Sequence, residues 1–176
     1  MALAATELDA ERSDLLAVLA SHRRFLRYTT RDLTDEQARA RTTVSELTLG
    51  GLIKHVTSVE EGWARFIVEG PSALGDASAM TEADWAKRAD EFRLLDDETL
   101  AGVLDVYEAT AAATTELVRT LPDLDASHPL PVAPWFPPSQ RWSARHALLH
   151  IIAETAQHAG HADIIRESLD GQKTMG

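Results

Sequence analysis

Apolar residues recur every three or four positions along four long stretches of this sequence, with charged residues between them. The stretches cover residues 9–30, 47–68, 100–121 and 143–170. Because side chains three and four positions apart lie on one face of an α-helix, each stretch predicts an amphipathic helix with one buried face. Four such helices of similar length predict an all-α protein folded as a four-helix bundle.

The segments between these stretches contain the residues that usually begin or end helices. Pro122 ends the third helix, and Ser143 is a predicted N-cap for the fourth. Residues 71–97 are predicted to cross over outside the bundle, with a short helix at 82–93. The acidic residues 96–98 place negative charge at the N-terminus of the third helix.

Three local patterns add detail to this bundle. Residues 34–37 have the form of a capping box and predict a short helical turn. Gly50-Gly51 costs the second helix about 2 kcal/mol of helix propensity, but it lets another backbone approach closely. Trp135 and Phe136 lie in a proline-rich loop, where we expect packing at the rim of the bundle rather than ligand recognition.

Composition and charge narrow the function classes. The 176 residues suffice for a single domain, which we place at residues 1–176. A formal net charge of −11 argues against nucleic acid and anionic membranes as partners, and the absence of cysteine excludes a catalytic thiol of the chain's own. Residues 1–7 lack the features of an export signal, and no stretch has the roughly 20 apolar residues of a membrane span, so we expect a cytoplasmic protein.

The fourth stretch carries a ladder of side chains that can bind metal. It reads His146, His150, Glu154, His158 and His161, with steps of four, four, four and three. A step of three or four keeps residues on one helix face, so the last three share an inward-facing seam. Counting by heptads puts Glu154 at a buried position, where a carboxylate needs a partner or a metal ion.

A second helix supplies a possible partner for this seam. His55 lies among apolar neighbours on the predicted inner face of the second helix. A set of His55, Glu154 and His158 suits a divalent metal and leaves coordination positions open for water or substrate. His161 is a fourth ligand, a hydrogen-bond donor behind a ligand, or a pocket residue, and we rank the pocket role first.

Two other histidines have weaker claims to the site. His150 drifts toward the edge of the inward face and fits a role beside the ligands, while His22 lies on the apolar seam of the first helix. The plain alternative is a metal-free bundle in which the histidines satisfy one another by hydrogen bonds, since pairs four residues apart are common on helices. That alternative predicts that chelators change nothing.

Residues 49–56 and 154–163 carry a resemblance to a known family. The chain resembles the DinB-like superfamily of four-helix metal proteins, most of which place one metal histidine on the second helix and two, four apart, on the fourth. Here Glu154 stands in place of the first of that pair. The resulting His, Glu, His set is similar to that of the mycothiol-dependent maleylpyruvate isomerase branch, and an uncharacterised actinobacterial subgroup looks like this chain throughout.

The resemblance implies an up-down-down-up bundle, often a homodimer, with His55, Glu154 and His158 as ligands of a divalent metal. Zinc is the first choice of metal, with nickel, iron and manganese as alternatives. The implied activity is that of a metal-dependent, mycothiol-type thiol S-transferase or isomerase, acting on a small-molecule thiol and a small electrophilic substrate. The alternative is a non-enzymatic stress-response or ligand-binding bundle with a structural ion.

Overall fold

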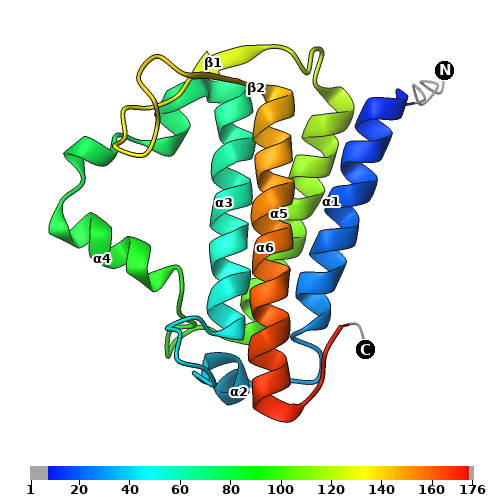
Figure 1. The fold of residues 1–176 in the computed structure, drawn as a ribbon, viewed down its shortest axis with the longest axis vertical. Coiled ribbons are helices and arrows are strands. Elements are labelled where there is room, and N and C mark those ends of the chain that lie inside the picture. The colour runs from blue at the N-terminus through cyan, green and yellow to red at the C-terminus, as the bar shows by residue number, and fades with distance from the viewer. Residues whose placement is uncertain (1–7, 175–176) are drawn as a thin grey trace.

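Four long helices make up most of the chain. The computed structural model describes residues 8–174, and the long helices are α1 (Ala10–Tyr28), α3 (Leu49–Glu69), α5 (Leu100–Thr120) and α6 (Ala144–Asp170). Figure 1 shows them side by side, with α1 and α6 running in one direction and α3 and α5 in the other. Each begins and ends within two residues of its predicted bounds, so the all-α prediction is confirmed.

Each long helix begins at a side-chain cap, which satisfies a backbone N–H that has no partner inside the helix. The caps are Asp9, Thr48, Thr99 and Ser143. The acidic residues 96–98 lie just before the N-cap of α5, and the first turn of the helix itself contains no acidic side chain. Glu98 instead binds Lys54 of α3 at 2.7 Å and accepts a hydrogen bond from the backbone N–H of Leu95 at 2.8 Å.

The segments outside the four long helices are short. Helix α2 (Asp35–Arg39) begins at the predicted capping box, which is confirmed. The crossover from α3 to α5 contains the 3-10 helices η1 (Gly70–Leu74) and η2 (Ala77–Ala79) and the helix α4 (Glu82–Asp90). Figure 1 shows α4 beside the bundle rather than within it, and none of its side chains is buried.

Helix α4 ends three residues before the predicted end at residue 93. Lys54 explains this end, because its ammonium group donates hydrogen bonds to the carbonyl oxygens of Asp90 and Arg93 at 3.1 and 2.9 Å. Both carbonyls point at a charge on α3, so the chain turns toward the bundle here. The turn brings Phe92 and Leu94 against the first residues of α3.

A small antiparallel hairpin, which the sequence pattern did not predict, joins α5 to α6. It pairs β1 (Ser127–Pro129) with β2 (Arg141–Ser143), with His128 opposite Trp142. Strands of three residues are too short to show an alternating pattern, and the prolines between them favoured an irregular loop. The pairing closes both ends of the loop that carries Trp135 and Phe136.

The bundle core consists of two clusters of buried apolar side chains with an ion pair between them. One cluster includes Leu26, Leu52 and Tyr107, and the other includes Leu19 and Trp63. Arg23 of α1 and Glu60 of α3 lie between these groups along their helices and are both buried.

The ion pair ties three helices together. Arg23 donates two hydrogen bonds to the Glu60 carboxylate, one of them at 3.1 Å, and a third to Thr115 of α5 at 3.2 Å. Fixed donors and acceptors of this kind specify one register among the helices, because any slip leaves a buried charge unpaired.

None of the described helices is long and apolar enough to cross a membrane. Residues 1–7, from which we predicted that no export signal is present, lie outside the described part of the chain.

Removing one partner of the buried ion pair should weaken the fold strongly. We expect Glu60→Ala to lower the free energy of unfolding by about 3–5 kcal/mol, because Arg23 keeps a buried charge without its carboxylate. The matched control is Glu61→Ala at the next, exposed position, which should change it by less than about 0.5 kcal/mol. Urea unfolding measures both, and equal losses would contradict the structural role of Glu60.

A second prediction concerns the close approach at Gly51, which the structure confirms. A Cβ atom there would lie 1.9 Å from the carbonyl oxygen of Phe92, whereas one at Gly160 on α6 would meet nothing within 4 Å. We expect Gly51→Ala to destabilise the protein by about 1–3 kcal/mol through overpacking. Gly160→Ala should stabilise it by up to about 1 kcal/mol, because only the helix propensity changes. Urea unfolding of the two variants gives opposite signs if this account is correct.

Candidate metal centre

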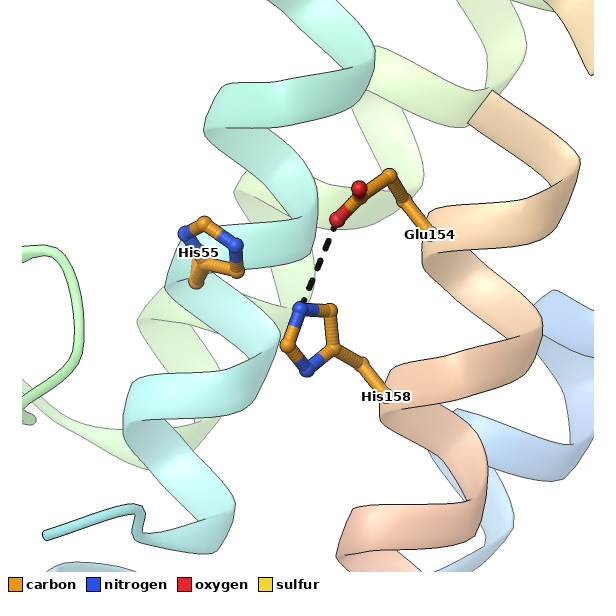
Figure 2. A group of neighbouring side chains, drawn as sticks. All are labelled: His55, Glu154 and His158. Carbon is orange, nitrogen blue, oxygen red and sulfur yellow. Dashed lines mark ion pairs between the residues drawn. The ribbon is translucent and has the colours of Figure 1, made fainter. Parts of the chain in front are cut away.

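Three side chains from two helices point into one space between α3 and α6. Figure 2 shows His55 on α3 facing Glu154 and His158 on α6. One nitrogen or oxygen atom of each residue lies within 4.8 Å of the others. Nε2 of His158 is 3.5 Å from Oε2 of Glu154, and the His55 and His158 rings meet edge to face at 4.8 Å between centroids. The structure therefore brings the three predicted ligands together.

The packing of α3 against α6 explains why these side chains meet. The face of α6 that turns inward carries small or branched apolar side chains, among them Ala147, Ile151 and Ala162, all fully buried. Small side chains let two helices approach closely. Glu154 and His158, four residues apart, lie on the same side of α6, where His55 of α3 stands opposite.

Burial differs among the three residues. His55 and His158 are buried, and Nδ1 of His55 has no hydrogen-bond partner among the described residues. The Glu154 side chain is 27% exposed, so this carboxylate is only partly buried at the position where the heptad count expects a buried residue. A straight α-helix drifts by about 20° per heptad, so residues that share a heptad seam gradually leave the buried face. Glu154 consequently lies where the centre opens outward.

The environment holds the donors of this group in their metal-binding forms. Burial, with a smaller effect of His158, lowers the pKa of His55 to about 4, although the Glu154 charge acts in the opposite direction. His55 therefore offers a neutral imidazole at pH 7. The hydrogen bond with His158 lowers the pKa of Glu154 below its usual value, so this residue is a carboxylate at pH 7.

His150 and His161 lie beside two different members of the group. Nε2 of His150 is 3.7 Å from Oε1 of Glu154, the oxygen that does not face His158. Nδ1 of His161 is 3.3 Å from Nδ1 of His158, the ring nitrogen on the side away from Glu154. Each thus contacts a group member from behind, and neither belongs to the set of converging atoms found among the described residues.

The structure does not bring His22 near this group, and the ring of His146 stacks on Trp142 instead. His22 is half-buried on α1, and its ring contacts Phe25 of the same helix at 6.2 Å between centroids. The apolar seam of α1 on which His22 was predicted to lie contributes Leu19 and Leu26 to the two core clusters.

Aromatic contacts around the centre were not predicted. Phe92 stacks on the His55 ring at 4.0 Å between centroids, with 24° between the ring planes. Trp63 and Trp142 stack on each other at 4.5 Å, and both contact His150 edge-on. Gly50-Gly51 did indicate a close neighbour for the start of α3, but nothing in the local pattern identified Phe92, about 40 residues further along the chain.

The donors of this group fit a divalent ion. Two imidazoles and one carboxylate are a common ligand set for zinc and for other first-row metals. A buried imidazole nitrogen without a hydrogen-bond partner is energetically costly, and coordination is one way to relieve such a cost near further donors. The three residues could therefore hold a metal ion, with coordination positions left open on the exposed side of Glu154.

Comparisons with known proteins bear on the fold and on the family of this chain. The comparison with curated proteins gave no match. A solved structure, the crystal structure of the conserved protein of locus from Enterococcus faecalis, is similar with a TM-score of 0.63 and 13% identity, over 91% of this chain and 97% of that chain. That likeness concerns the fold alone.

A family model described as mycothiol-S-transferase matches residues 14–171, which include all four long helices except the first residues of α1. The match confirms the resemblance to DinB-like proteins that residues 49–56 and 154–163 indicated. The chain belongs to the mycothiol-S-transferase family.

Proposed function

We propose that the protein is a metal-dependent thiol S-transferase that uses a mycothiol-type thiol, with His55, Glu154 and His158 as the metal ligands. The observation that carries this proposal is the convergence of these three donors within 4.8 Å between α3 and α6. Membership of the mycothiol-S-transferase family supports the thiol as one substrate. The second substrate would be a small electrophile.

The reaction requires a sulfur that the chain itself does not provide. The sequence contains no cysteine, so the nucleophile must come from a small thiol. A bound divalent ion would supply a Lewis acid that lowers the pKa of this thiol and holds it as a thiolate. We place zinc first because two imidazoles and a carboxylate suit it, with nickel, iron and manganese as alternatives.

The residues behind the ligands would orient them. His150 contacts the outer oxygen of Glu154, and its ring makes edge contacts with both Trp63 and Trp142. His161 contacts the outer nitrogen of His158. Partners of this kind fix the orientation of metal ligands and their loss commonly weakens metal binding by about 10–100-fold. We propose this positioning role for both histidines.

The alternative of a closed structural ion finds less support in the geometry. A four-coordinate site would need His161 to turn an atom toward the other three donors, whereas its Nδ1 meets the far side of His158 at 3.3 Å. Three ligands with open positions are typical of catalytic sites, and four protein ligands are typical of structural ones. A homodimer stays a prediction. A groove runs between α3 and α5, and the exposed side chains of Val68 and Val106 that line it offer an apolar surface for a second copy.

The ligand assignment predicts the metal content of variants. Purified wild-type protein loaded with zinc should retain about one ion per chain, whereas His55→Ala and His158→Ala should each lose it, because two remaining donors hold the ion weakly. The matched control is His22→Ala, which removes a half-buried histidine outside the group and should keep full occupancy. Elemental analysis after dialysis gives the number of zinc ions per chain in all four proteins.

Thermal unfolding and catalysis complete this test. A ligand that binds only the folded state raises its stability, so a chelator should lower the melting temperature of the wild type and leave that of His158→Ala unchanged. The loaded wild type should also transfer mycothiol to 1-chloro-2,4-dinitrobenzene with release of chloride, and His158→Ala should not. The ligand assignment would be wrong if either ligand variant kept its full zinc content, or if a chelator left the melting temperature of the wild type unchanged.

A further inference from the structure

A pocket lies near the candidate metal centre and contains none of its three residues. It has a volume of about 400 Å³, which is within the range of small-molecule sites, and lies between the α4 side of the crossover and the proline-rich loop. Trp63 of α3 contributes to its lining, and so do Trp135 and Phe136 of the loop. We call it the Trp135 pocket.

Two lining residues of the Trp135 pocket connect it to the surroundings of the metal centre. Its lining residue Trp63 contacts His150 at 4.9 Å between ring centroids, and His150 in turn contacts Glu154. Its lining residue Glu91 directly precedes Phe92, whose ring lies on His55. Trp63 and His150 therefore lie between this pocket and Glu154, and Phe92 lies between it and His55.

The side chains of the pocket select a chemical class of ligand. Aromatic faces pack against the C–H faces of sugar rings, which are apolar, and carboxylates accept hydrogen bonds from hydroxyl groups. The lining holds three carboxylates, those of Asp76, Asp84 and Glu91, against the cations of Lys87 and Arg88. In a chain of net charge −11 this balance does not attract an anion. It suits a neutral, polyhydroxylated molecule.

We propose that the Trp135 pocket binds the sugar part of the thiol substrate, with the sulfur directed toward His55, Glu154 and His158. This inference rests on the proposed function and adds to it which part of the protein recognises the thiol. Mycothiol has the required chemistry, because it joins an N-acetylcysteine to a glucosamine–inositol unit that is rich in hydroxyl groups. The electrophilic substrate then approaches from the solvent side of Glu154, outside this pocket.

Two exposed tryptophans provide a matched pair of variants. Trp135 is 54% exposed and lines the pocket, whereas Trp85 of α4 is 45% exposed and does not line it. Neither belongs to the buried core, so both alanine variants should keep the wild-type melting temperature. Cobalt-loaded protein provides the readout, since a thiolate bound to cobalt gives an absorption band, and calorimetry gives the affinities.

The titrants are mycothiol, its thiol-free N-acetylglucosamine–inositol part, and N-acetylcysteine. We expect Trp135→Ala to weaken binding of the first two by about tenfold, because a tryptophan in a binding site commonly contributes that much, and to leave N-acetylcysteine unchanged. Trp85→Ala should bind all three like the wild type. The thiol-free part should also compete with mycothiol for the wild-type protein.

The outcomes separate this inference from the proposed function. If neither thiol produces the cobalt band, the proposed function fails, and this inference fails with it. If both thiols produce the band but Trp135→Ala binds mycothiol as tightly as the wild type, only the inference is overturned. It is also overturned if Trp135→Ala raises KM for the electrophile and not for mycothiol, because the pocket would then hold the other substrate.

Discussion

The packing of α3 against α6 sets the register on which the rest of the site depends. His55 reaches Glu154 and His158 because α3 packs against α6 at this level. The buried pair of Arg23 and Glu60 holds α3 against α1 and α5 just beyond His55 along α3. A slip of α3 by one turn would break this ion pair and would also move His55 away from Glu154 and His158. The register of α3 therefore determines both the stability of the bundle and the geometry of the candidate metal centre.

The crossover between α3 and α5 completes the surroundings of His55. Gly51 leaves space for the backbone of Phe92, and Lys54 binds the carbonyl groups on both sides of that residue. Together they place the Phe92 ring on His55. This face of the imidazole is thereby closed to water, while the exposed side of Glu154 stays open to ligands.

Local periodicity was sufficient to predict the helices and to place His55, Glu154 and His158 on facing sides of two of them, because each lies on an apolar helix face and helix bundles bring such faces together. It overestimated the burial of Glu154, since a heptad count ignores the drift of a straight helix. The sequence does contain a signal for the Arg23–Glu60 pair. Each of the two residues interrupts an apolar helix face, Arg23 four positions after Leu19 and Glu60 four positions after Val56. Opposite charges on facing seams indicate a buried pair.

The contacts made by Phe92 and by the hairpin had no comparable signal. Phe92 meets His55 across a crossover whose path depends on hydrogen bonds from Lys54, and sequence periodicity contains no information about such a path. The three-residue strands of the hairpin pair across a loop rather than through a repeating pattern. Both features depend on the tertiary structure, which positions segments that are distant along the chain.

X-ray absorption at the zinc edge of the loaded protein tests the central claim most directly, since it reports the atoms bound to the metal. We expect the zinc ion to be bound by nitrogen and oxygen atoms only, with the multiple-scattering signature of two imidazoles. Addition of mycothiol should introduce one sulfur at about 2.3 Å without loss of either imidazole. A shell that contains three imidazoles, or one that is unchanged by the thiol, would contradict the account.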